Sequence, residues 1–411
     1  MKTNIKTTWW KVKLGEFANI NPTVQLQRGK EYSFLDMADV TPLSRTTNWQ
    51  KRKIFKGSGA RFEEGDTLFA RITPCLENGK ITQAQELKSP AFGSTEFYVL
   101  RGIQGVSDSD FIHYLSRTFR IRKLAEGSMV GASGRQRVER VAFENIETEV
   151  PESLEIQKRI ADILSAFDDK IELNNKISKN LEATAQAIFK EWFVNFRFPG
   201  HEKIKMIDSE LGEIPEGWGV KMLPEVFDFL EGPGIRNWQY APEGCRFINI
   251  RLIQNNDIDI KSANSISEKE ANGKYKHFHL QERDMVVSTS GTLGRLAIVR
   301  EEHLPLLLNT SVIRFKPKDK QNYGFMYQFL NSAYFQNKVL SMASGSAQPN
   351  FGPVHLKQIE VLMPDKSILG TFGSSVNSIY ERIIAIKSEN QKLAALRDLL
   401  LPKLMSGEIL V

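Results

Sequence analysis

Residues 154–193 read LEIQKRIADILSAFDDKIELNNKISKNLEATAQAIFKEWF, and this stretch decides the fold. Its apolar side chains return at alternating steps of four and three residues, beginning with Ile160, Leu164 and Phe167. This spacing is the seam of a two-helix coiled coil. About 40 residues, each adding roughly 1.5 Å, predict a helical rod of roughly 60 Å.

The same seam returns near the end of the chain, where Phe372 stands in the place of Ile160. Asn174 interrupts the first seam and Asn390 interrupts the second. Buried polar residues in a seam cost stability but fix the register of the pair. Arg397 indicates a second seam that becomes more exposed toward its end. A seam that is followed by its copy predicts a duplicated unit.

The segments between the seams read as two α/β globules. In the first, short runs at 32–40, 67–72 and 96–101 lie between turn residues and predict strands, and 109–125 predicts a helix. The second globule repeats this order, with 245–253 in the place of 32–40. We therefore expect five segments, which are a first globule at 1–153, a long helix at 154–195, a connector at 196–215, a second globule at 216–365 and a second long helix at 366–411.

Each rod has one apolar stripe, which needs a partner. The stripes have equal length, so pairing within the chain is the simplest solution, and the short connector favours an antiparallel pair. The expected fold class is mixed α/β, with two globules joined by an intramolecular antiparallel coiled coil in a pseudo-two-fold repeat. Two alternatives remain open: a parallel pair, and rods that each pair with another chain.

Composition bounds the setting of the protein. The chain is 41% hydrophobic and 25% charged, an ordinary soluble composition. Cys75 and Cys245 lie in different halves, which predicts a reducing, cytoplasmic setting. No apolar run approaches the roughly 20 residues of a membrane span. A net charge of +6 permits an anionic partner, although many soluble proteins are equally basic.

Polar loops in both globules hold the side chains that read base edges and bind phosphates. The alternative is that these loops are simply solvated. The candidate DNA-binding residues are Lys51, Arg52, Lys53, Arg71, Lys80, Ser133, Arg135, Gln136 and Arg137 in the first globule, and Thr289, Ser290, Arg295, Gln348 and Asn350 in the second.

Catalytic and metal motifs are missing from the sequence. It has no phosphate-binding Gly-x-x-x-x-Gly-Lys loop and no Gly-x-Gly-x-x-Gly after a strand. Its six histidines lack the companion residues of a zinc site. We therefore expect no catalytic residue, no metal and no cofactor in this chain.

The ends of the rods are more apolar than one seam requires. Trp192 and Phe193 give this excess to the first rod, and Leu400 and Leu404 give it to the second. Exposed apolar patches mark interaction sites, so these four residues are expected to dock helices of a partner protein.

Three segments resemble the specificity subunit of type I restriction–modification systems. They are LGEIPEGW at 211–218, LLPKLMSGEI at 400–409 and IFKEWFVNF at 188–196. The alternation of globule and rod extends the resemblance over nearly the whole chain. The globules of this family diverge widely, so no base-contacting residue is carried over by motif.

The resemblance implies that each globule is a target-recognition domain reading one half of a bipartite, asymmetric DNA site. The coiled coil would be the ruler between the halves. The rods would dock two methyltransferase subunits, which bring S-adenosylmethionine and methylate adenine at N6. Motor-nuclease subunits, with ATP and magnesium, would join for restriction.

Two other functions remain open at this point. The chain could itself be a site-specific nuclease or methyltransferase, which the missing motifs argue against. It could also be a coiled-coil adaptor that binds only proteins.

Overall fold

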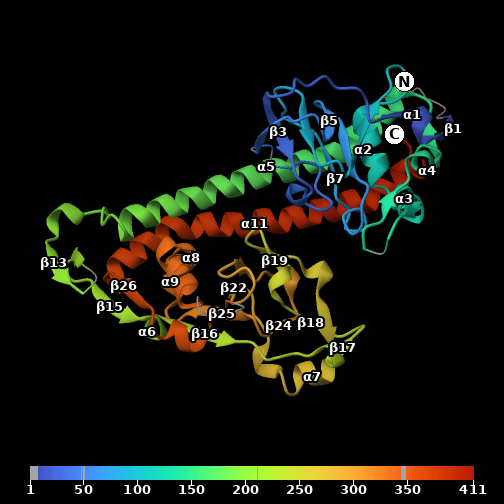
Figure 1. Ribbon diagram of the computed structural model, residues 1–411. Helices are drawn as coiled ribbons and strands as arrows, with labels where there is room; N and C mark the ends of the chain where they lie inside the picture. Colours follow the sequence, from blue (N-terminus) through green and yellow to red (C-terminus); the bar gives the residue numbers. More distant parts are fainter. Residues whose placement is uncertain (1–7, 48, 50, 133, 211, 344–348) are drawn as a thin grey trace, which may run out of the picture. The chain divides into compact units, whose positions relative to one another are not determined.

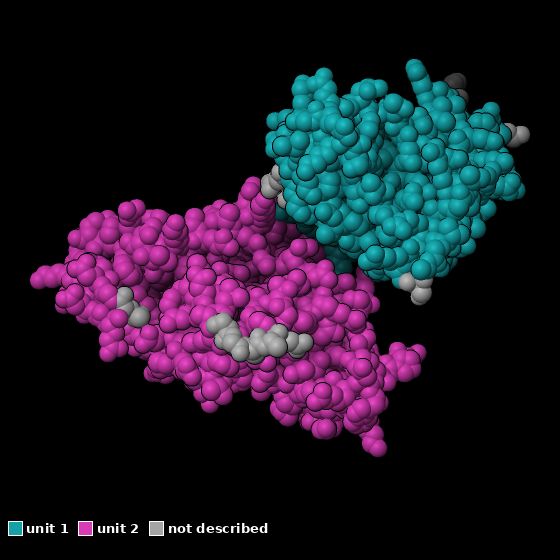
Figure 2. Space-filling model, viewed as in Figure 1, with its two compact units in different colours: residues 1–175, 389–411 teal, residues 176–388 magenta. Residues whose placement is uncertain are grey.

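The computed structural model describes residues 8–47, 49, 51–132, 134–210, 212–343 and 349–411. The chain forms two compact units, shown in Figure 2: unit 1 (Met1–Asn175 and Glu389–Val411) and unit 2 (Lys176–Ser388). Two helices of 40 residues each, α5 (Leu154–Phe193) and α11 (Lys366–Met405), run from one unit into the other (Figure 1). The units therefore divide inside the long helices, whereas the expected segments change where the helices begin.

Helices α5 and α11 pair with each other in antiparallel orientation. Within unit 1, Asp168 of α5 bonds Arg397 of α11, and the Asn174 amide donates to Asn390 Oδ1 at 2.8 Å. Residue numbers rise along one helix as they fall along the other. Intramolecular antiparallel pairing is thus confirmed, and Asn174 lies buried in the seam as its spacing predicts.

One expectation about the seam is wrong. Arg397 is only 4% exposed, so the seam does not open toward the end of the chain. Asp168 faces Arg397 across the seam, and Arg117 Nη1 lies 3.4 Å from the same carboxylate. The buried carboxylate offsets the free energy needed to remove the Arg397 guanidinium from water. The apolar spacing of the seam could not show that Asp168 faces inward.

Unit 1 contains a four-stranded antiparallel sheet beside a second sheet with one parallel pairing, between β3 and β8. The first sheet has the order β2 (Ala18–Ile20), β9 (Phe97–Gly102), β6 (Thr67–Ala70), β7 (Ile81–Gln83), and the second has the order β4 (Arg52–Ile54), β3 (Glu31–Leu35), β8 (Ala91–Gly93), β5 (Ala60–Phe62). The other elements are β1 (Trp9–Lys13) paired with β12 (Glu147–Pro151), β10 (Met129–Val130) paired with β11 (Arg137–Val138), and helices α1 (Leu14–Phe17), α2 (Ser109–Arg117), α3 (Phe119–Gly127) and α4 (Arg140–Glu144).

Unit 2 repeats the order of the first sheet, and its β18 and β24 form the matching parallel pair; β24 ends its sheet, whereas β8 also pairs with β5. The first sheet has the order β16 (Phe227–Glu231), β25 (Val312–Pro317), β22 (Met285–Ser288), β23 (Leu296–Ile298), and the second has the order β17 (Tyr240–Ala241), β21 (Asn264–Ile266), β18 (Cys245–Phe247), β24 (Leu306–Leu307). The other elements are β15 (Gly219–Met222) with β26 (Glu360–Met363), β13 (Met206–Ser209) with β14 (Gly212–Pro215), β19 (Ile253–Gln254) with β20 (Asp257–Ile258), and helices α6 (Leu223–Val226), α7 (Glu268–Asn272), α8 (Tyr323–Asn331), α9 (Ala333–Ala343) and α10 (Pro353–Leu356).

The duplication extends to single side chains. The turn before β6 is closed by Asp66, whose carboxylate accepts from the Glu63 N–H at 2.8 Å and pairs with Arg101. The turn before β22 is closed in the same way by Asp284, with Lys316 in the place of Arg101. Such agreement between distant segments is what a repeated unit predicts.

Three local expectations are corrected. The helix expected at 109–125 is broken at Thr118, which has extended backbone and caps α3 with its hydroxyl. The strand expected at 32–40 ends at Leu35, because Asp36 caps a short 3-10 helix, η1 (Met37–Asp39). The connector contains the β13–β14 hairpin.

Each unit uses the end of one long helix and the beginning of the other as part of its core. In unit 1, Ile160 and Leu164 of α5 and Leu404 of α11 are buried with Phe111 and Phe143. Unit 2 does the same with the opposite ends of the helices. Its cluster contains Phe189, Phe193, Phe372, Phe325 and Phe315. Burying one such side chain stabilises the fold by roughly 1.5–3 kcal/mol, so the helix ends are fixed to the globules.

Among the described residues, no helix combines the length and the apolar character that crossing a membrane requires.

Candidate nucleic-acid interface

In unit 1, the loop after β6 joins the β10–β11 hairpin, and we call this contact junction 1 (residues 71–75 and 134–138). Ile72 forms a bridge with Arg137, and the Thr73 N–H donates to the Gln136 carbonyl at 3.0 Å. The Gln136 N–H donates to Thr73 Oγ1 at 3.0 Å in return. The fold therefore brings Arg71 to Gln136 and Arg137, which lie more than 60 residues further along the chain.

Junction 1 carries more positive than negative charge. Arg137 binds Glu96 through two nitrogens, at 2.6 and 2.9 Å, and Arg71 Nε lies 3.8 Å from the same carboxylate. The hydrogen bonds from Arg137 lower the pKa of Glu96, which stays ionised. One carboxylate thus serves two guanidinium groups. Arg135 lies beside them, exposed and without an acidic partner among the described residues.

In unit 2, the loop after β22 joins the segment before α10, and we call this contact junction 2 (residues 289–295 and 349–351). Ser290 forms a bridge with Asn350, and the Phe351 N–H donates to the Thr289 carbonyl at 3.1 Å. This is the place of junction 1 in the repeat, because β22 corresponds to β6 and α10 to α4. Exposed Asn350 and half-buried Ser290 stand where unit 1 has arginines.

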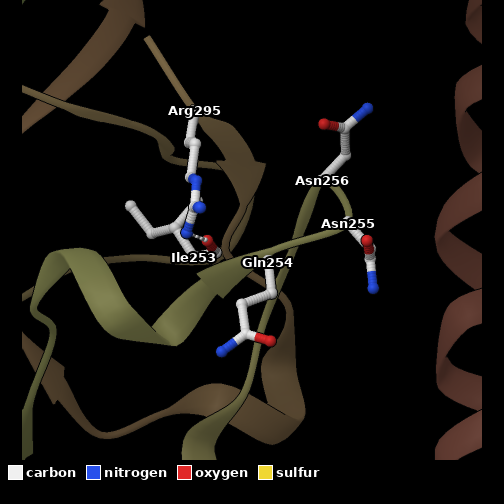
Figure 3. Close-up of a pocket in the computed structure, with 5 residues that line it drawn as sticks. All are labelled: Ile253, Gln254, Asn255, Asn256 and Arg295. Carbon is white, nitrogen blue, oxygen red and sulfur yellow. Dashed lines mark hydrogen bonds between the residues drawn. The ribbon is translucent and has the colours of Figure 1, made fainter. Parts of the chain in front are cut away.

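A hollow of about 440 Å³ lies beside junction 2 and is lined by Arg295 and the turn between β19 and β20 (Figure 3). The Arg295 guanidinium donates to the Ile253 carbonyl at 3.2 Å, which holds the side chain at the wall of the hollow. Asn255 and Asn256 have positive φ angles of 52° and 54°, a conformation that asparagine tolerates better than most residues. Gln254 completes a lining of amides and one cation, the groups that bind base edges bidentately.

A second basic surface in unit 1 is built around the turn after β4, and we call it the basic loop cluster (Arg28, Lys53, Lys56 and Arg61). Arg28 Nε donates to the Lys56 carbonyl at 2.9 Å, and Arg61 donates to the Gly57 carbonyl at 3.4 Å. Lys53 Nζ lies 3.7 Å from the centre of the Phe34 ring. None of the four has a carboxylate partner among the described residues, so their charges are free for an anion.

Three other predicted residues, Lys51, Arg52 and Lys80, already bind partners within the chain. Lys51 pairs with Asp39 at 2.5 Å and Arg52 with Glu31 at 2.9 Å. Lys80 is half-buried and donates to the Met37 carbonyl at 2.7 Å. Ser133 and Gln348 lie outside the described residues.

Thr289 is wrong as a DNA contact, because only 2% of it is exposed. Its N–H donates to the Ser311 carbonyl at 2.9 Å, which continues the pairing of β22 beyond the strand. The backbone of Thr289 thus organises junction 2, while its side chain faces the interior.

The residues expected to dock a partner are used within the chain. Phe193 and Leu404 are buried in the cores of units 2 and 1, so their assignment to a partner is wrong. Trp192 is half-buried, with its ring 5.6 Å from that of Phe372, and half-buried Leu400 packs against the core of unit 1. The apolar excess at the rod ends therefore anchors the rods to their own globules.

One residue of these surfaces was missed by sequence reasoning. Arg28 belongs to the basic loop cluster although it lies far from it in the chain, and its only local signal is the Arg28-Gly29-Lys30 turn. The sequence leaves two roles open for Trp49 and Trp238, part of the core, which is favoured, or stacking on bases; Trp49 packs on Phe62, whereas Trp238 is 80% exposed.

Comparison with known proteins agrees with this arrangement. The family described as "Type I restriction modification DNA specificity domain" matches residues 6–183 and again 215–395. The chain is 25% identical to the HindI type I restriction enzyme specificity subunit of Haemophilus influenzae, over 84% of this chain and 87% of the relative. It is 27% identical to the MjaVIII specificity subunit of Methanocaldococcus jannaschii, over 72% of this chain and 70% of that one.

A solved structure shares the fold. The crystal structure of the type I restriction–modification S subunit from M. genitalium superposes with a TM-score of 0.54 at 16% identity, covering 98% of both chains. The family match covers both halves of the duplicated chain, including both junctions and the first 30 residues of each long helix. The chain therefore belongs to the family of type I restriction–modification DNA specificity domains.

Proposed function

We propose that this chain is the non-catalytic, DNA-reading subunit of a type I restriction–modification complex, in which each unit reads one half of a bipartite site. The observation that carries the proposal is the pair of equivalent junctions with unlike side chains. A repeated scaffold that presents arginines in one unit and amides in the other is suited to two different half-sites.

The chemistry of the two surfaces supports two kinds of contact. The unpaired cations of the basic loop cluster suit phosphates, which fix the position of a protein on the duplex. The amides and Arg295 around the hollow of unit 2 suit base edges, as does Arg135 in unit 1. Each unit would thus combine positioning with readout.

The catalytic partners are part of the same proposal. Two methyltransferase subunits would bring S-adenosylmethionine and methylate adenine at N6, and motor-nuclease subunits would bring ATP and magnesium, all in the cytoplasm. Among the described residues of this chain, no three His, Cys, Asp or Glu side chains are placed to hold a metal ion. Because Phe193 and Leu404 are buried, docking would use other surfaces of the chain.

Salt dependence of DNA binding tests the proposal. The chain, assembled with its methyltransferase, should bind duplex DNA with an affinity that falls steeply with salt. The double variant R28A/R61A should lower the slope of log affinity against log salt by about one for each lost phosphate contact. The matched variant R52A, whose guanidinium is already paired with Glu31, should change the slope less.

Two outcomes would contradict the proposed function. One is the absence of duplex binding at low salt by the assembled complex. The other is methylation or cleavage of DNA by the purified chain alone, supplied with magnesium and S-adenosylmethionine.

A further inference from the structure

Trp238 is the most exposed large apolar side chain among the described residues, at 80%. It lies in a short 3-10 helix, η3 (Asn237–Gln239), in the loop between β16 and β17 of unit 2. Tryptophan is usually highly buried, so one that is held in solvent points to a ligand.

The loop holds Trp238 from both sides. On one side, the buried Ile235 donates its N–H to Asn309 Oδ1 at 3.1 Å. On the other, the buried Gln239 amide donates to Glu270 and to the Tyr275 hydroxyl, both at 2.9 Å. The backbone that carries Trp238 is therefore held in place before a ligand binds, which lowers the cost of ordering the loop.

The loop is continuous with junction 2. The Thr310 N–H donates to the Pro233 carbonyl at 2.8 Å, and the neighbouring Ser311 accepts from the Thr289 N–H at 2.9 Å. Two hydrogen bonds therefore separate the base of the Trp238 loop from the proposed reading surface. The backbones also approach closely, because a Cβ atom on Gly232 would lie 2.3 Å from the Asn309 carbonyl carbon.

The surroundings of Trp238 favour an anionic, aromatic ligand. Between residues 232 and 242 the only charged side chain is Arg236, which is exposed, as is Asn237. The corresponding loop of unit 1, at 21–30, carries Arg28 and Lys30 but no aromatic residue. The same loop position thus presents an aromatic face in unit 2 and only cations in unit 1.

We infer that Trp238 stacks on a nucleobase at an unstacked step of the half-site read by unit 2. The inference rests on the proposed function, and it adds a deformed base step to the recognition of that half. Apolar wedges that insert between base pairs open the stack, and flexible pyrimidine–purine steps do so most easily. Arg236 is placed to contact the phosphate beside that step.

Selection and fluorescence together test this inference. The wild-type complex with its methyltransferase selects binding sites from duplexes with a random 40-base-pair region, and affinity is then measured on the selected duplex. W238A should weaken binding roughly tenfold, the effect of losing one base–aromatic stack. W238F, which keeps an aromatic ring, should bind within a few-fold of wild type, and the control W10A, a tryptophan of unit 1, should bind like wild type.

Quenching of tryptophan emission gives a second readout. The selected duplex should quench the emission of the wild-type and W10F complexes, and W238F should remove most of that quenching. Unchanged affinity in W238A, or unchanged quenching in W238F, would overturn the stacking role and leave the proposed function standing. If the wild-type complex enriches no sequence, the proposed function itself fails.

Discussion

At the residue scale, Arg71 and Arg137 share one carboxylate, that of Glu96. Arg71 and Arg137 were found because they are charged, yet only the fold shows that both face Glu96. Thr289 has the residue type of a phosphate contact, but continued pairing beyond β22 buries it. Arg28 was missed because its partner, the Lys56 carbonyl, is distant in the chain and is brought close only when β3 pairs with β4.

The buried carboxylate of Asp168 binds three side chains in the core of unit 1. It accepts from the Tyr114 hydroxyl at 2.8 Å, lies 3.4 Å from Arg117 and bonds Arg397. D168N leaves the buried Arg117 without its carboxylate partner and leaves Arg397 with only the partly exposed Asp398, so it should destabilise the chain by about 3–5 kcal/mol. Urea denaturation measures this, with the exposed D162N on the same helix as control. Equal midpoints for D168N and D162N would show that the buried charges do not hold the unit together.

The buried His303 should make the stability of unit 2 fall at acid pH. Burial, together with the Arg300 guanidinium, lowers the pKa of His303 to about 4. The unfolded chain takes up this proton near pH 6.5, so the contribution of the neutral ring is complete above 6.5 and is lost as the pH falls toward 4. The shift corresponds to roughly 3 kcal/mol.

The variant H303Q keeps a polar side chain opposite the Arg300 N–H, which donates to the ring at 3.1 Å, but it cannot take up a proton. Its thermal stability should therefore change less than that of wild type between pH 6.5 and 4. Parallel pH profiles for the two proteins would contradict the assignment.

At the scale of elements, the long helices were the most predictable part of the fold. The alternating four and three spacing repeats over many turns, so single exceptions do not obscure it. The shorter elements were less predictable, because one cap is enough to end them. Thr118 divides α2 from α3, and Ser332 divides α8 from α9 in the same way. These breaks allow paired helices to fold against each sheet, a tertiary requirement that leaves only a weak local signal.

The polar pair in the seam should be energetically coupled. Asn174 donates to Asn390 Oδ1 at 2.8 Å and to Glu389 at 2.9 Å across the helix pair. A double-mutant cycle of N174A and N390A should give a coupling of about 1 kcal/mol, the net worth of one such bond. The pair N174A and N180A, with Asn180 exposed on the same helix, should be additive. Additivity in both cycles would remove the role of the asparagines in setting the register.

At the scale of the whole molecule, duplication was readable because the sequence repeats its order of strands, helices and turns. The internal comparison placed 245–253, where β18 begins, opposite 32–40, which lies in and after β3. The structure confirms this in the two parallel strand pairs, and it adds the two junctions as a further correspondence. Which DNA contacts each unit makes could not be predicted in the same way. It depends on which side chains the junctions expose, and these diverge between the two copies.

Mapping methylated adenines in a genome shows whether each unit reads its own half of the DNA site. Cells would carry this chain with its methyltransferase, or a chimera in which residues 1–153 come from another member of the family. We expect a bipartite, asymmetric site with a fixed unspecified gap, of which the chimera changes one half and keeps the other. A continuous or palindromic site, or a chimera that changes both halves together, would contradict the claim that each unit reads its own half.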